Sequence, residues 1–244
     1  MAVFAFTSAA GSPGVTTTAL GLALEWPGEV LLVDADPVGG SPILAGFYGG
    51  TVQHPGTLVE MWAAHRQGRL DDALREMPLR IADHASFIPG PAGAAQAGSL
   101  SELWQALAPR LRTLSAMDVD VLIDLGRLGH QHFPTPLARA ADEVLLVMRS
   151  DLVAVAAAAA CEIPTDAPVH VALVGEKRPY TAREVSSVIK KDVTVSLPWA
   201  PEAATVFSHG TKDSKKTTGL RRALRQAGES LRWRADRREE ASDD

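Results

Sequence analysis

The sequence has very little cysteine, few aromatic residues and no excess of positive charge. Cys161 is the only cysteine among 244 residues, so one chain builds neither a disulfide framework nor a site of several thiolates. The formal net charge of -5 argues against a protein that coats nucleic acid through bulk charge. A hydrophobic content of 46% and a charged content of 22% are those of an ordinary globular protein. The length and the even spread of apolar residues favour one large domain.

Long hydrophobic runs are also missing. The longest apolar run, Leu152 to Cys161, is about half of what a membrane-spanning helix needs. The N-terminal residues show no basic segment followed by an apolar one, as an export signal would. We therefore expect a cytoplasmic protein, with recruitment to a membrane or a cell pole left open.

Short apolar runs alternate with helical stretches along the chain. Near-continuous apolar strands separated by helices predict an α/β fold: a doubly wound, mainly parallel sheet with helices on both faces. The expected strands are Val3–Phe6, Val30–Val33, Ala85–Ile88, Val119–Ile123, Glu143–Met148, Val169–Val174 and Val193–Leu197. The expected helices are Thr16–Glu25, Leu58–Gln67, Leu70–Glu76, Ser99–Ser115, Thr135–Ala141, Leu152–Glu162, Ala182–Lys190 and Thr217–Trp233.

These elements are assigned to one domain, residues 1–233. A loop rich in Pro, Gly and Ala follows Ile88, and a polar segment at 208–216 is expected to be flexible. The charged tail, residues 234–244, is expected to be disordered.

A glycine-bearing turn, Ser8-Ala-Ala-Gly-Ser-Pro-Gly-Val-Thr-Thr-Thr, joins the first strand to the first helix. Backbone N–H groups converge in such a turn, and the helix dipole adds about half a positive charge, so the arrangement binds anions. The candidate ligand-binding residues are Gly11, Ser12, Gly14, Val15, Thr16 and Thr17. The alternative is a tight turn that only closes a strand.

Carboxylates follow two other strands. The second strand ends in Leu31-Leu-Val-Asp-Ala-Asp-Pro, which places Asp34 and Asp36 at its carboxyl end, where open α/β sheets bind ligands. The strand from Val119 ends at Asp124, followed by Gly126. Asp and Pro also simply end strands in turns, and many buried strands end in Asp.

Together these segments resemble the ParA/MinD superfamily of dimerising P-loop ATPases, from Ala2 to about Leu231. The resemblance implies ATP or ADP with Mg²⁺ as cofactor, Thr16, Asp34 and Asp124 around the metal, and Asp36 orienting the attacking water. The family loop carries two lysines, whose positions here are Ala10 and Val15. The family also reads adenine with an asparagine where Gly175 stands. The resemblance therefore implies weak or absent ATP hydrolysis, and it leaves open that no cofactor binds.

The resemblance is nearest to actinobacterial MinD-like proteins and to TadZ/CpaE-like localisation factors of pilus and secretion systems. It implies a homodimer that serves as a scaffold or positioning factor for a larger assembly. The alternative is an active ATPase of DNA partitioning or protein localisation, with Lys177, Arg127 or a partner subunit supplying the missing charge.

The last predicted helix is basic and amphipathic, with apolar residues at Leu220, Leu224, Ala227 and Leu231. It is interpreted as the final helix of the domain, packed on the sheet with a basic outer face. A peripheral membrane contact or a non-specific DNA contact through residues 212–238 are the alternatives. His130 and His132 alone make an incomplete metal site.

Overall fold

The computed structural model describes residues 1–213 and 215–242, except the side chains of 239, 241 and 242. One eight-stranded sheet runs through it in the order β3-β4-β2-β5-β1-β6-β7-β8. All neighbours pair in parallel except β3 and β4. The strands are β1 Val3–Ser8, β2 Val30–Asp34, β3 Leu79–Ala82, β4 Ala85–Ile88, β5 Asp120–Arg127, β6 Glu143–Arg149, β7 Val169–Val174 and β8 Val193–Leu197. The predicted doubly wound α/β fold is confirmed.

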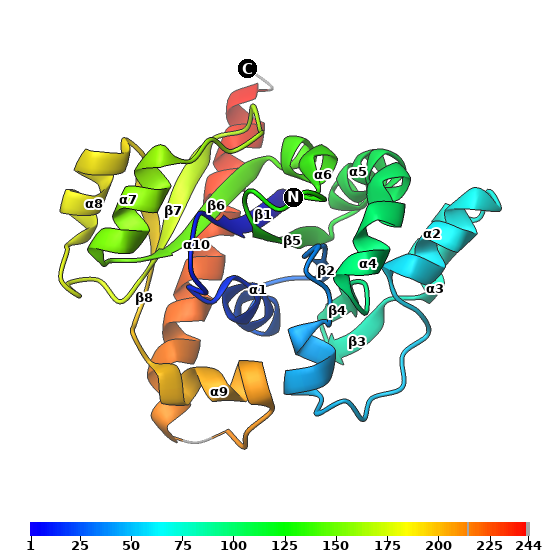
Figure 1. Cartoon of the computed structure of the whole chain (residues 1–244), viewed down its shortest axis with the longest axis horizontal. Helices are drawn as coiled ribbons and strands as arrows, with labels where there is room; N and C mark the ends of the chain where they lie inside the picture. The colour runs from blue at the N-terminus through cyan, green and yellow to red at the C-terminus, as the bar shows by residue number, and fades with distance from the viewer. Residues whose placement is uncertain (214, 243–244) are drawn as a thin grey trace.

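Helices cover both faces of the sheet (Figure 1). On one face α1 Val15–Leu24, α9 Pro201–His209 and α10 Thr218–Ser242 pack on the core side chains of β1 and β2. The other face is covered by α2 Leu58–Arg66, α3 Leu70–Glu76, α5 Ser101–Ser115, α6 Thr135–Ala140, α7 Leu152–Ala160 and α8 Ala182–Ile189. Short helical turns complete the chain: η1 Ile43–Phe47, α4 Ala94–Ala97, η2 Gly98–Leu100 and η3 Lys215–Thr217.

The central strands are buried on both sides, as the apolar runs predict. Every residue of β1 is buried, and so is every residue of β2. Helices start at side-chain caps where the sequence provides them: Thr57 with Glu60 at α2, and Thr181 with Glu184 at α8, form capping boxes.

The elements missed from the sequence include β3 at the edge of the sheet and α9. Strand β3 is short, half-exposed and antiparallel, so it lacks the buried apolar run by which the other strands are recognised. Helix α9 begins at Pro201 in a proline-rich segment that is typical of a loop. Its C-cap, Gly210, lies within the segment predicted to be flexible, and residue 214 of that segment lies outside the described residues.

The prediction of a disordered tail from residue 234 is wrong over the described residues. Helix α10 continues to Ser242, and Ala235 is buried on it. Arg234 and Arg238 both bond to Glu143, which is fully buried at the start of β6. The charged residues are therefore ordered by a buried carboxylate that lies far away in the sequence. Residues 243 and 244 lie outside the described residues.

The last helix is a structural part of the domain, as the packed-helix interpretation expects. Leu220, Leu224, Ala227 and Leu231 are all buried in the core between α10 and the sheet. A lipid surface therefore cannot meet these four side chains without detaching the helix. Across the part of the chain that the structure describes, no helix has the length and apolar character to cross a membrane.

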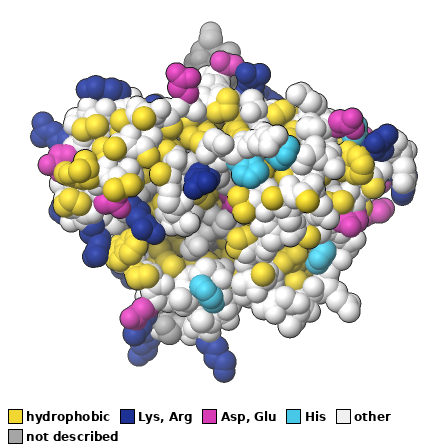
Figure 2. Space-filling model, in the orientation of Figure 1, with side chains coloured by type: hydrophobic (Ala, Val, Ile, Leu, Met, Phe, Trp, Pro, Cys, Tyr) yellow, Lys and Arg dark blue, Asp and Glu magenta, His cyan; other side chains and the backbone are white. Residues whose placement is uncertain are grey.

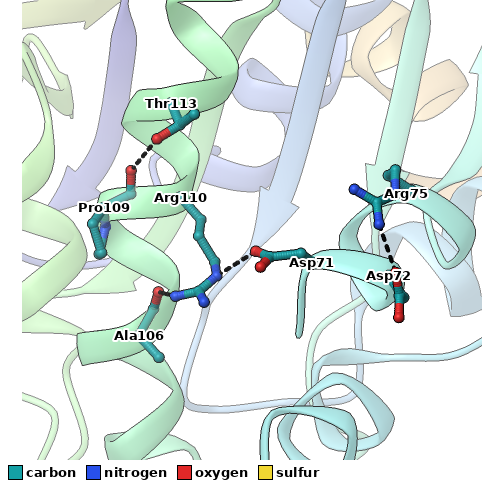
Figure 3. A network of polar contacts seen from close by, with 7 residues as sticks. All are labelled: Asp71, Asp72, Arg75, Ala106, Pro109, Arg110 and Thr113. Carbon is teal, nitrogen blue, oxygen red and sulfur yellow. Dashed lines mark hydrogen bonds and ion pairs between the residues drawn. The ribbon is translucent and has the colours of Figure 1, made fainter. Parts of the chain in front are cut away.

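Surface ion pairs fasten the outer helices (Figure 3). Arg110 of α5 donates through Nε to Asp71 of α3 at 2.5 Å, and its Nη1 donates to the Ala106 carbonyl at 2.9 Å. Asp71 is 63% exposed, so the contribution of this pair to stability is about 0.2–1 kcal/mol.

Candidate functional site

The turn between β1 and α1 has the backbone geometry of an anion cradle. Gly11 has φ 65° and Gly14 has φ 100°, conformations that other residues rarely adopt. Gly14 caps α1 in a left-handed conformation without a side-chain cap. The first N–H groups of α1 are therefore left to an incoming ligand, at the positive end of the helix dipole.

The turn borders a cavity of about 450 Å³, which we call the phosphate cavity. It gathers, from separate elements, every predicted ligand-binding residue together with one predicted catalytic carboxylate and one arginine. They are Gly11, Ser12, Gly14, Val15, Thr16 and Thr17 of the turn and helix, Asp36 after β2, and Gly126 and Arg127 of β5. The roles of these residues stay predictions.

The other two predicted carboxylates lie beneath this cavity on neighbouring strands. Asp34 and Asp124 are partners in the register of β2 and β5, and their exposed fractions are 1% and 0%. Oδ1 of Asp124 accepts from the Gly126 N–H at 2.9 Å, and Oδ1 of Asp34 accepts from the Asp36 N–H at 3.3 Å. The Oδ2 atom of each carboxylate is buried without a hydrogen-bond partner.

Burial and mutual repulsion make these carboxylates weak acids. Burial, with the charge of Asp36 as a smaller cause, raises the pKa of Asp34 to about 6. Burial, followed by the charge of Asp34, raises the pKa of Asp124 to about 7. The nearby Thr16 hydroxyl offsets only part of that rise in the pKa of Asp124. Such a pair is poised to exchange its protons for a cation near neutral pH.

Glycines allow the carboxylates to sit so close to the backbone. A Cβ on Gly126 would lie 2.4 Å from Oδ1 of Asp36, and one on Gly90 would lie 2.9 Å from Cγ of Asp34. Asp36 also accepts from the Val38 N–H at 2.9 Å, which turns its carboxylate back toward the loop after β2. The Gly-rich loop after β4 therefore forms part of the site's wall, a role that the sequence analysis did not assign to it.

The two positions where the resemblance expects lysine offer no positive charge. Ala10 has a methyl side chain, and the Val15 side chain is 7% exposed and packs into the core beneath α1. Among the residues that line the phosphate cavity, Arg127 carries the only cationic side chain. Lys177 is not among them; its backbone is tied to Tyr180 in the turn after β7.

A second arginine, which the sequence analysis missed, holds the loop from outside. Nη2 of Arg149 donates to the Ser12 carbonyl at 3.0 Å, and its Cζ lies 5.0 Å from the ring centre of Trp199. Arg149 is the last residue of β6, and the pairing of β6 with β1 that brings it to the loop is not visible in the sequence.

The donors present fit Mg²⁺. Hard oxygen ligands suit this ion, and the site offers two buried carboxylate oxygens without partners beside the Thr16 hydroxyl. The described residues contain no group of three or more His, Cys, Asp or Glu placed to hold a metal, so waters or phosphate oxygens would complete the coordination. His130 and His132 lie side by side, 6.1 Å between ring centres, and lack a third ligand among the described residues.

Comparison with known proteins shows which solved structures share this fold. No protein-family model matches the chain, and no curated protein matches it in sequence. Solved structures do match in shape. A ParA family ATPase from Chlorobium tepidum is 18% identical, with a TM-score of 0.73 over 93% of this chain and 97% of that one. The cell division ATPase MinD of Pyrococcus furiosus is 17% identical, with a TM-score of 0.72 over 95% and 98%.

A third match is McdA from Cyanothece, solved as the ATP complex of a single-residue variant. It is 18% identical, with a TM-score of 0.67 over 95% of this chain and 96% of that one. The three matches cover nearly the whole length on both sides. This chain has the fold of the ParA and MinD ATPases.

Proposed function

We propose that this chain is a degenerate relative of the ParA/MinD ATPases that works as a dimerising positioning factor, with weak or absent ATP hydrolysis. The observation that carries the proposal is the composition of the phosphate cavity. It keeps the glycine cradle and Asp36, with Asp34 and Asp124 beneath it, and its one cationic side chain is Arg127. A charge-assisted contact to phosphate contributes about 1.5–3 kcal/mol, so a loop without lysines holds nucleotide loosely.

The chemistry of phosphoryl transfer supports slow turnover. Losing one donor that stabilises the transition state costs about 10²–10³ in rate. The bound Mg²⁺ would supply charge neutralisation at the phosphates. The chain's own residues would hold it through Asp34, Asp124 and Thr16, orient a water through Asp36, and anchor phosphate through the loop N–H groups. Isothermal titration with Mg-ATP, together with a turnover assay, tests the proposed loss of hydrolysis. Tight binding of ATP with fast turnover would contradict the proposal.

The apolar surface around the loop supports a homodimer. Leu152 and Val153, at the start of α7, are 65% and 76% exposed, and Val38 beside the phosphate cavity is 55% exposed. Leu152 and Val153 border Ala10, Gly11 and Ser12 on the outer side of the loop. A second copy covering this surface would remove the apolar side chains from water.

The dimer is tested by changing that surface. Val153→Asp is expected to shift the mass measured by light scattering from dimer to monomer, since it places a charge in an apolar contact. Val188→Asp is the matched control, because Val188 on α8 is 56% exposed and does not line the loop. If both variants keep the mass of the unchanged protein, the loop face is not the dimer interface.

An active ATPase remains the second candidate, and one observation favours it. Arg127 lies in the phosphate cavity, where it could replace a lysine. Arg127→Gln and Asp36→Asn would each abolish turnover in that case, whereas unchanged turnover in both variants rejects it.

The assembly that is served is proposed from resemblance. We propose a pilus or secretion-type machine or another complex at the cell pole, with DNA partitioning as the alternative. For an anionic partner of residues 212–238 we propose the outer face of α10, where Arg222 and Arg237 are exposed. Co-purification of a secretion-type ATPase or of a centromere-binding protein separates these assemblies.

A further inference from the structure

A second cavity opens from the phosphate cavity toward α9. Its volume is about 150 Å³, and we call it the side cavity. It shares Ser12, Pro13, Gly14 and Thr17 with the phosphate cavity, so the two form one crevice. In the space-filling view a hollow lies in front of α1, and hydrophobic side chains border it (Figure 2). A ligand anchored by its phosphates in the loop would place its organic part in the side cavity.

The far end of the side cavity is apolar. Its hydroxyl-bearing side chains, Ser12, Thr17 and Thr18, all belong to the phosphate end. The remainder of the wall comes from β8, α9 and α10, and includes Leu197, Pro198, Trp199, Pro201, Phe207 and Leu224. The two prolines have no N–H to offer. The indole N–H of Trp199 is the one side-chain donor at this end, and every nucleobase carries an acceptor for it.

The backbone of Gly175, beside this wall, is also closed to a ligand. The Gly175 N–H donates to the Leu197 carbonyl at 2.8 Å, and the Gly175 carbonyl accepts from the Ser150 hydroxyl. Both polar groups of Gly175 are thus used inside the protein. A Cβ at this position would lie 3.1 Å from the Trp199 Cβ and 3.3 Å from the Arg178 Cδ. Trp199 and Arg178 therefore fill the space that a larger residue at 175 would need.

Two guanidinium groups lie against the Trp199 ring and line neither cavity. The Cζ atoms of Arg149 and Arg178 lie 5.0 Å and 5.4 Å from the centre of the Trp199 ring. Trp199 is 40% exposed between the side cavity and these two guanidinium groups. A guanidinium attracts any polyphosphate and carries no information about the base attached to it.

From these contacts we infer that the crevice takes nucleoside polyphosphates with Mg²⁺ without selecting the base. The inference rests on the proposed function, because it uses the same phosphate cavity. Sites that hydrogen-bond a group on the ligand reject analogues lacking it by about 10⁴–10⁵, whereas apolar pockets separate similar ligands by about 10²-fold at most. The side chains of this wall make an apolar pocket. The phosphates would therefore supply most of the binding free energy, and the base would add an apolar contact.

Titration of the purified protein with ATP, GTP and inorganic tripolyphosphate, each with Mg²⁺, tests the inference. The expected dissociation constants of ATP and GTP agree within about fivefold, and tripolyphosphate binds more weakly than both. A preference for either nucleotide of about a hundredfold or more overturns the inference, as does the absence of binding by both. Neither result touches the proposed slow hydrolysis, which is measured by turnover alone.

A pair of tryptophan variants locates the base contact. Trp199→Ala is expected to weaken the binding of ATP and of GTP by the same factor, about three- to tenfold, and to leave the binding of tripolyphosphate unchanged. Trp233→Ala, on the exposed outer face of α10, is the control and is expected to change none of the three. If Trp199→Ala changes ATP and GTP by different factors or weakens tripolyphosphate equally, the side cavity does not hold the base.

Discussion

The two ends of the central strands both carry buried carboxylates, and the two sets are treated in opposite ways. At the end where β5 and β6 begin, Glu143 meets Arg234 and Arg238 of α10, while Asp120 accepts from the Trp26 indole N–H and the Ala2 N–H. At the other end, Asp34 and Asp124 each keep a buried oxygen without a partner.

The presence or absence of partners distinguishes carboxylates that stabilise the fold from carboxylates that are left open to a ligand. A buried carboxylate is stable when cations and hydrogen bonds compensate it, and costly when they do not. The domain compensates the first set with its own residues and leaves the second set beside the loop between β1 and α1. The second set is the one that we propose to face a bound metal ion with phosphate.

Breaking the compensated set should have the largest effect. Glu143→Gln leaves Arg234 and Arg238 without their charge partner, so the free energy of unfolding should fall by about 3–5 kcal/mol in urea denaturation. Glu240→Gln, an exposed position on the same helix, is the control and should change it little. A loss below about 1 kcal/mol for Glu143→Gln would mean that α10 is not anchored by this carboxylate.

The uncompensated set should show itself in the pH dependence of stability. The folded-state pKa values of Asp34 and Asp124, about 6 and 7, lie above the ordinary value of 3.8. Folding therefore favours the protonated forms of both carboxyl groups. Their contribution to the free energy of unfolding is largest below about pH 4 and is lost as the pH rises through the folded-state pKa values. Without Mg²⁺, the free energy of unfolding should decline by about 4 kcal/mol between pH 5 and pH 8.

Asp124→Asn should flatten that decline, because it removes one of the two titrating carboxylates. Added Mg²⁺ should raise the stability of the unchanged protein at pH 8 more than at pH 5, and should do so less in the variant. A decline that keeps its full size in Asp124→Asn would show that other groups titrate in this window.

An exposed pair gives the smallest effect and completes the comparison. Arg110→Ala removes the contact to Asp71, which joins α5 to α3 at the surface (Figure 3). Solvent screens this pair, so the free energy of unfolding should fall by about 0.2–1 kcal/mol, and less at high salt. A loss above about 2 kcal/mol would place this contact among the buried pairs instead.

The sequence analysis locates the residues that line the phosphate cavity and does not locate the far wall of the side cavity. Gly11, Gly14, Asp34, Asp36 and Asp124 are all found from local patterns, because each lies among the last residues of a strand or in the turn that follows it. The side cavity is built from a loop near residue 12 and a wall near residue 199, and nothing in either segment indicates the other. Trp199 and Arg149 were accordingly missed.

The end of α10 was misjudged for the same physical reason. Its charges predict a solvated tail when taken alone, and only the fold brings Glu143 beneath Arg234 and Arg238. Burial even lowers the pKa of Arg234 to about 10, far enough above neutral pH for the side chain to stay charged. Local pattern finds elements and their ends, whereas partners across the sheet need the fold.

Steady-state turnover of Mg-ATP by the purified protein, measured alongside calorimetric binding, tests the central claim most directly. The claim is that the loop without lysines has lost efficient phosphoryl transfer, although Asp34, Asp36 and Asp124 are still present at the site. The account predicts weak, Mg²⁺-dependent binding and turnover at least about 10² below one event per second. Turnover at about one per second or faster, abolished by Asp36→Asn, would contradict it.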